Sequence, residues 1–296
     1  MKTIVYLTDA DEIACTVAKY ALATAYKLKA NLLLYSSISI DERYPIPDEQ
    51  TDEYVACKKL KKANIEVGFT ILRSQLEVDL QQNYPADGFI PAIDYACWEG
   101  SFTESVSVLS YNKDILMMVL ANNEHETLYG YVSDADFQQT LDAAKLPLLI
   151  VPENNAVGGF DKILFATDGR YNEIDYIQSL TGFAKYFDAS IIVSAIGGKN
   201  KLTSNQKALK LFMSDLAFKL NFGRASYYEL PDNVDAPLEW LIDNEQVDLI
   251  AVAHRKGIFA DRLLSMGISK EKVSQLNIPM LVYSGDKASV FSTVNL

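Results

Sequence analysis

The chain has 296 residues, of which 49% are hydrophobic and 22% are charged, and its formal net charge is −12. This length suits two domains of roughly 150 residues each, and the composition excludes a mostly disordered chain. The acidic balance argues against a broad nucleic-acid-binding face, and no apolar run approaches the ~20 residues of a membrane span. The first residues contain no signal-peptide hydrophobic region, so we expect a cytoplasmic protein that binds neither membranes nor nucleic acid.

Apolar runs of strand length alternate with stretches of helical periodicity along the first half. In chain order they predict a strand at 3–8, a helix at 11–29, a strand at 31–35, a helix at 49–63, and strands at 65–72, 114–120 and 148–151. The segment 73–113 reads as an added loop or a longer helical excursion.

The second half follows the same plan. In chain order it predicts a strand at 162–168, a helix at 171–187, a strand at 190–196, a helix at 203–220, a strand at 225–230, a helix at 237–244, and strands at 248–253 and 280–283. Runs of this kind suit strands that are buried on both faces of a parallel sheet. The alternation predicts a doubly wound α/β fold.

Two landmarks recur in both halves. Residues 2–9 read KTIVYLTD and residues 162–168 read KILFATD, while LPLLIV at 146–151 parallels IPMLVY at 278–283. A repeat of this length indicates two copies of one unit. We therefore predict domains at 1–152 and 161–296, joined by a polar linker at 153–160. Residues 1–152 carry a net charge of −10, and residues 153–296 carry −2.

These landmarks resemble the universal stress protein family in its tandem form. The likeness rests on Thr8-Asp9, on Thr167-Asp168-Gly169 and on the two closing runs, and it covers nearly the whole chain, once per half. The resemblance implies an adenine nucleotide alpha hydrolase-like, or Rossmann-like, domain in each half, with a five-stranded parallel sheet flanked by helices. It also implies that the two domains pair within one chain through their last strands.

Family members that bind ATP carry the pattern G-x-x-G-x9-G-[ST] after the fourth strand. Gly257 and Gly267 keep the nine-residue spacing, but His254 stands at the first glycine, and Ser269 comes one residue after the hydroxyl position. Glycines let the backbone approach phosphates, and free N–H groups at a helix start hold them. The resemblance thus implies a second-domain site for ATP or AMP with Mg²⁺, or for another anion, at Asp168, His254, Gly257, Gly267 and Ser269.

Clustered bases near these glycines would favour an anion. They are Arg255, Lys256, Arg262, Lys270 and Lys272. The alternative interpretation is a solvated loop and helix surface. For His254, a side chain hydrogen-bonded to backbone is the alternative to a ligand contact.

The first half keeps little of the phosphate pattern. The run 121–126, ANNEHE, offers no glycine pair, and nearby acids would repel phosphate, so we predict no nucleotide there. Glu124-His125-Glu126 reads as a solvated turn, because further metal ligands are not apparent. No P-loop and no nucleophile elbow occurs, so we predict no catalytic residue. We also predict no metal ligand.

The three cysteines are Cys15, Cys57 and Cys97. An odd number at wide spacing predicts reduced thiols and no disulfide framework. For Cys97 we expect an apolar packing position.

The function expected from the resemblance is a stress-response binding or regulatory module without efficient turnover. A slow ATPase at the second-domain site and a scaffold without a small ligand remain alternatives. Further options for partners are a homodimer and a second protein.

Overall fold

The computed structural model describes most of the chain, in segments separated by gaps. The described residues are 1–8, 14–38, 52–85, 88–122, 135–153, 159–167, 173–195, 212, 214–215, 222–228, 237–254, 278–284 and 291.

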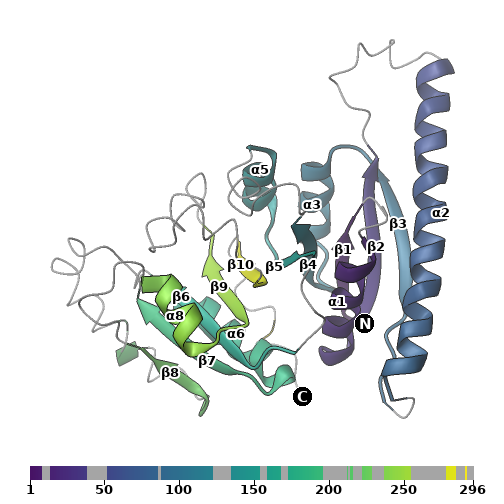
Figure 1. Ribbon diagram of the computed structural model, residues 1–296. Coiled ribbons are helices and arrows are strands. Elements are labelled where there is room, and N and C mark those ends of the chain that lie inside the picture. The colour runs from purple at the N-terminus through teal and green to yellow at the C-terminus, as the bar shows by residue number, and fades with distance from the viewer. Residues whose placement is uncertain are drawn as a thin grey trace.

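Strands and helices alternate through the first half of the described chain (Figure 1). In the first half they are β1 (Thr3–Leu7), α1 (Ala14–Lys27), β2 (Asn31–Ile38), α2 (Asp52–Asn83), β3 (Ile93–Glu99), α3 (Phe102–Ser110), β4 (Ile115–Asn122), α5 (Ala135–Ala143) and β5 (Leu148–Pro152). In the second half they are β6 (Lys162–Thr167), α6 (Glu173–Phe187), β7 (Ser190–Ala195), β8 (Ala225–Tyr227), α8 (Pro237–Glu245), β9 (Leu249–Ala253) and β10 (Met280–Tyr283).

The ten strands form one sheet in the order β3-β2-β1-β4-β5-β10-β9-β6-β7-β8. Neighbouring strands are parallel except β5 and β10, which are antiparallel and pair Leu149 with Leu281. The order therefore reads the same from either edge, with the last strand of each half at the centre. Because the sheet is continuous, the domain limits 1–152, 153–160 and 161–296 remain a prediction.

Two buried layers cover the faces of this sheet. Successive strand residues alternate between them: Ile4 and Tyr6 belong to one cluster, and Val5 and Leu7 belong to the other. Helices α1, α2 and α6 contribute to the first cluster, and α3, α5 and α8 contribute to the second. The period of two explains why the strand sequences read as continuous apolar runs, since both faces are buried.

The predicted strand at 65–72 is wrong, because these residues lie in the middle of α2. Ile65, Val67, Phe69 and Ile71 alternate with other residues as in a strand. In the structure Ile65 and Phe69 are buried, whereas Val67 and Ile71 are 60% and 56% exposed. The buried stripe continues at Leu72, Leu76 and Leu80, which is helical spacing.

The third strand of the first half is β3, inside the segment 73–113. It pairs in parallel with β2, from Leu32 opposite Ile93 to Ile38 opposite Glu99. The segment is thus not an added loop. It contains the end of the long helix α2 together with β3 and α3. Of the two alternatives predicted for this segment, the structure therefore agrees with the longer helical excursion.

The predicted helix at 203–220 falls mainly outside the described residues. Cys97 packs partly buried against the first core cluster, as expected, and burial raises the pKa of its thiol. All three cysteines are free thiols. Among the helices that the structure describes, none has the length and apolar character needed to cross a membrane.

Phe160, at the end of the predicted linker, joins the helices of the two halves. Its ring is 1% exposed and lies 5.8 Å from the ring of Tyr20 on α1. On the other side it lies 5.5 Å and 4.8 Å from Phe183 and Phe187 of α6. These tilted and edge-on contacts are the arrangements that aromatic pairs favour.

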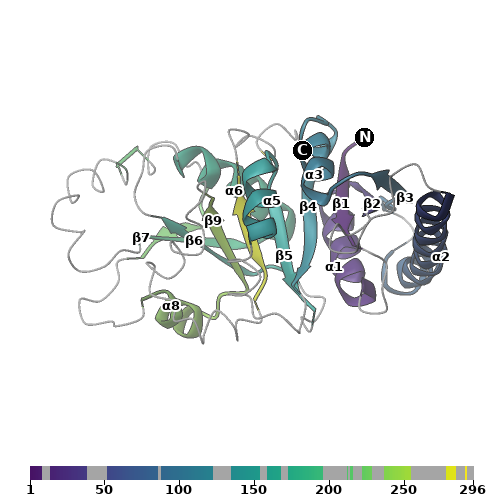
Figure 2. The ribbon, with the colours of Figure 1, turned by 90° about the horizontal axis from the view of Figure 1, so that it is seen from above.

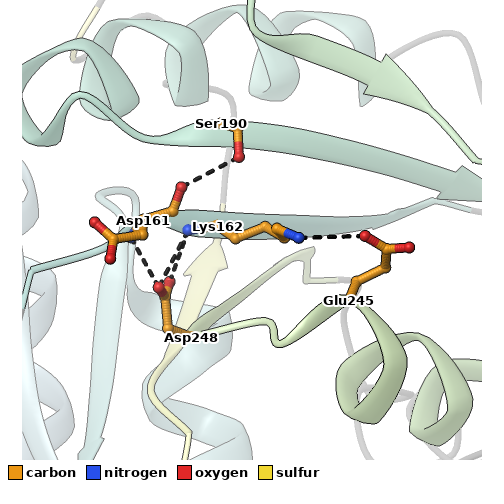
Figure 3. Close-up of polar contacts among 5 residues, drawn as sticks. All are labelled: Asp161, Lys162, Ser190, Glu245 and Asp248. Atoms are coloured by element: carbon orange, nitrogen blue, oxygen red, sulfur yellow. Dashed lines mark hydrogen bonds and ion pairs between the residues drawn. The ribbon is translucent and has the colours of Figure 1, made fainter.

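The amino edge of the second half is fixed by one carboxylate (Figure 3). Asp248 accepts hydrogen bonds from the backbone N–H of Asp161 at 2.8 Å and from that of Lys162 at 3.1 Å. Lys162 also pairs its ammonium with Glu245 at 3.3 Å, and the Asp161 carbonyl accepts from the Ser190 hydroxyl. These contacts hold the start of β6 between β7 and β9.

Asp248 predicts a pH dependence of folding. Burial raises the pKa of this carboxyl above its usual 3.8, and the two backbone donors only partly offset the rise. Because the pKa is raised in the folded state, protonation of this carboxyl favours the folded protein. The stabilising contribution is fully present below pH 3.8 and is lost as the pH rises through the pKa of the folded state. The substitution Asp248→Asn should remove this loss.

The check is urea unfolding of both proteins from about pH 3 to about pH 7. As the pH rises, the free energy of unfolding of Asp248→Asn should increase relative to that of the wild type. A difference that does not change with pH would contradict the expectation.

Candidate functional site

The second half has a topological switch point at the carboxyl edge of its sheet. From β6 the chain continues to β7 and β8 on one side, whereas β9 and β10 lie on the other side. The switch point therefore falls between β6 and β9, which pair in parallel with Ala166 opposite Val252. Ligands of open α/β sheets bind outside the carboxyl ends of the strands at such a point. The residues that follow these two strand ends begin at Asp168 and His254.

His254 connects this edge to the first half. Its backbone N–H donates to the carbonyl of Tyr283 at 2.7 Å, which fixes it beside the end of β10. Its Nε2 lies 2.7 Å from Oδ1 of Asp142 on α5, and the His254 side chain is 5% exposed. Nearby, the Ser284 hydroxyl donates to the carbonyl of Leu146 at 3.2 Å. The imidazole at the first position of the glycine pattern therefore contacts a carboxylate 112 residues away.

A buried carboxylate lies at the same edge. Glu173, the first residue of α6, is fully buried and accepts a hydrogen bond from the hydroxyl of Thr167, the last residue of β6. On the next strand the fully buried Ser194 donates its hydroxyl to the carbonyl of Tyr228 at 3.0 Å. Sequence reasoning stopped at Thr167-Asp168 and missed Glu173. An acid at the start of a predicted helix was the available signal, since helix N-termini favour negative charge.

The strand registers place Asn122 of the first half in the position of His254. Val119 is opposite Tyr6, and Ala251 is opposite Phe165, with Thr8 and Thr167 closing the two repeats. Asn122 comes three residues after Val119, and His254 comes three residues after Ala251, so the two occupy equivalent positions. The two halves thus differ at this edge by an amide in place of an imidazole, in addition to the glycine pattern.

Most of the predicted site lies outside the described residues. Of the five residues named from the sequence, His254 is described, whereas Asp168, Gly257, Gly267 and Ser269 are not. The run 124–126 and the basic cluster that begins at Arg255 are also outside it. Within the described part of the chain, no group of three or more His, Cys, Asp or Glu side chains could hold a metal ion.

The contact between His254 and Asp142 predicts a measurable coupling between the halves. The substitution Asp142→Ala should lower the free energy of unfolding by about 1–3 kcal/mol, because it leaves the buried imidazole without this acceptor. Asp114→Ala, at an exposed carboxylate in the same half, is the matched control and should change it by less than about 0.5 kcal/mol. Equal losses in the two variants, measured by urea unfolding, would show that the contact contributes nothing.

Comparison with solved structures finds the same architecture over the full chain. A universal stress protein from Archaeoglobus fulgidus DSM 4304 superposes with a TM-score of 0.65 and 12% sequence identity, covering 96% of this chain and 97% of that one. A functionally unknown protein from Pseudomonas aeruginosa PAO1 gives a TM-score of 0.54 and 13% identity, covering 99% and 95%. No family profile matches the sequence, and no curated protein sequence matches it.

The fold of this chain is therefore α/β and universal stress protein-like, as the resemblance implied. At 12–13% identity the comparison speaks to the fold alone.

Proposed function

We propose that this chain is a tandem universal stress protein that acts as a cytoplasmic stress-response binding or regulatory module. Its ligand would be an adenine nucleotide or another anion, held at the carboxyl edge of the second half. The observation that carries the proposal is the switch point between β6 and β9. In the sequence Asp168 follows β6 directly, and Gly257 and Gly267 lie 4 and 14 residues after the end of β9.

The chemistry of the residues supports an anion there. Backbone N–H groups freed by Gly257 and Gly267 would cradle phosphate oxygens, Ser269 would add a hydroxyl donor, and Arg255 and Lys256 would supply positive charge. The first half offers Asn122 and acidic residues at the corresponding place, so we expect one ligand per chain.

His254 gives the site a route to the first half. It follows β9 immediately, and its imidazole contacts Asp142 on α5. A ligand that shifts the chain at 254–257 would alter this contact, and α5 packs in the core layer of the first half. Binding in one half would then change the surface of the other, which is what a regulatory module requires.

Thermal melting, phosphate release and pull-down separate the three functions. A binding module should melt at a higher temperature with millimolar ATP and Mg²⁺ without releasing phosphate at a significant rate. Release of phosphate that tracks binding would favour the slow ATPase. No shift with ATP, AMP or inorganic phosphate, together with specific capture of a protein, would favour the scaffold and refute the nucleotide proposal.

A further inference from the structure

Helix α2 has two apolar stripes on opposite sides. The inner stripe, Ile65, Phe69, Leu72, Leu76 and Leu80, is buried against the first core cluster. On the outer side Leu60, Val67, Ile71 and Val78 are 64%, 60%, 56% and 50% exposed. The solvent side of a surface helix is usually polar, so these four aliphatic side chains need an explanation.

The outer residues follow a heptad repeat. Steps of three and four residues connect eight exposed positions, which we call the outer seam: Cys57, Leu60, Asn64, Val67, Ile71, Ser74, Val78 and Gln81. Alternating steps of three and four are the pattern by which one helix packs along another in a coiled coil. The outer seam spans more than three heptads, and none of its side chains belongs to either core cluster of the chain.

The outer seam is complementary to itself when two copies run in opposite directions. With the centre between Val67 and Ile71, Val67 faces Ile71 of the second copy, and Leu60 faces Val78. In the same register Asn64 faces Ser74, so polar side chains meet polar ones. Antiparallel coiled coils pair positions in this way, and a two-fold axis makes both contacts twice.

The charges of α2 favour the antiparallel orientation over the parallel one. Residues 58–62 include four lysines, whereas residues 66–83 carry three acids and one arginine. A parallel pair would place the lysines of both copies together, and an antiparallel pair places them beside the acidic end. Because Lys58 already pairs with Glu99 at 2.9 Å, and Arg73 pairs with Glu77, these charges act on orientation more than on strength.

The helix is in a position to be reached. In both ribbon views α2 lies at the outer end of the molecule, beside α1 and β3, and no helix or strand that the structure describes lies beyond it (Figures 1 and 2). Its inner stripe already fixes the helical backbone. Association therefore avoids the cost of helix nucleation, which makes a short isolated coiled coil marginal.

We infer that two copies of this chain associate through the outer seams of their α2 helices, antiparallel about a two-fold axis. This interface lies at the β3 edge of the sheet, separate from the carboxyl edge of the second half, and the inference does not rest on the proposed ligand.

Sedimentation of the full chain tests the association. The wild type should be a dimer at micromolar concentration, and Ile71→Glu should weaken it roughly a hundredfold, since the charge is introduced twice per dimer. Val108→Glu, at a 50% exposed aliphatic residue of α3, is the matched control and should leave the dimer intact. A monomeric wild type up to about 0.1 mM, or a dimer that persists in Ile71→Glu, would overturn the inference.

Cross-linking tests the orientation in a protein whose seam is otherwise intact. In the antiparallel register Cys57 faces Gln81 of the second copy. The variant Gln81→Cys should therefore form a disulfide under diamide between Cys57 of one chain and the introduced thiol of the other, identified by peptide mass. The two Cys57 residues lie about 36 Å apart along the helix axis in this register, so the wild type should not cross-link through them.

A disulfide between the two Cys57 residues of the wild type would show a parallel pair and refute the inference. Circular dichroism identifies an Ile71→Glu chain that fails to fold, in which case Val67→Glu replaces it.

Discussion

Replacing Phe160 by alanine should lower the free energy of unfolding by about 3–5 kcal/mol, one of the largest effects of any single substitution in this chain. The ring is almost fully buried and contacts Tyr20 from the first half and Phe183 and Phe187 from the second. The truncation removes its dispersion contacts and leaves a cavity between α1 and α6 that neither helix can fill alone. Urea unfolding followed by circular dichroism measures the loss.

Phe102→Ala is the matched control for this prediction. Phe102 is the same residue type but is 37% exposed at the start of α3, so its loss should be about 1 kcal/mol or less. A similar loss in both variants would mean that Phe160 is not part of a core shared by the two halves. Separate unfolding transitions in Phe160→Ala would be consistent with the predicted division at 153–160.

Leu149 and Leu281 should be coupled in a double-mutant cycle. They are partners across the antiparallel pair of β5 and β10, and both are fully buried. Each alanine substitution should cost about 2–5 kcal/mol, and the double variant should differ from their sum by about 0.5–3 kcal/mol. This coupling energy measures the junction of the two half-sheets directly.

The control cycle combines Leu149→Ala with Ile191→Ala. Ile191 lies on β7, four strands from β5, a separation of about 19 Å across the sheet. Substitutions that far apart should add within about 0.5 kcal/mol. If the Leu149–Leu281 pair is also additive, the central strand pair contributes no interaction beyond the burial of each side chain.

The central strands could be predicted from the sequence because burial on both faces leaves little choice of residue. β4 and β5 read ILMMVLAN and LLIVP, and their register partners are equally apolar. Such runs are short, bounded by polar residues and rich in branched side chains, and they repeat in both halves. The fold class followed from these runs and their duplication, and the pairing of the last strands followed from the family resemblance.

α2 and β3 were missed for related reasons. Two apolar stripes on one helix put Ile65, Val67, Phe69 and Ile71 at alternate positions, which mimics a strand. The edge strand β3 includes Asp94 and Glu99 and has a half-exposed face, so it lacks the apolar run of a buried strand. If α2 pairs with a second copy, the alternation of apolar residues arises because one stripe of the helix packs in the core and the other packs against the second copy.

The strand ends that lead to the candidate site were predicted from the sequence, whereas the site residues themselves remain a prediction. The strand ends that lead to Asp168 and His254 were placed correctly at one edge of the sheet. The contact of His254 with Asp142 joins residues 112 positions apart, and the burial of Glu173 depends on how α6 meets β6. Local patterns contain neither piece of information, because both arise from the packing of separate elements.

We propose that the carboxyl edge of the second half binds an adenine nucleotide through its glycine pattern, and isothermal titration calorimetry of ATP with Mg²⁺ into the full chain and into Gly257→Val is the decisive experiment. We expect one site per wild-type chain and no measurable heat of binding to Gly257→Val, because a branched side chain would fill the space of the phosphates. Equal binding to both proteins, or none to the wild type with millimolar ATP, would contradict it.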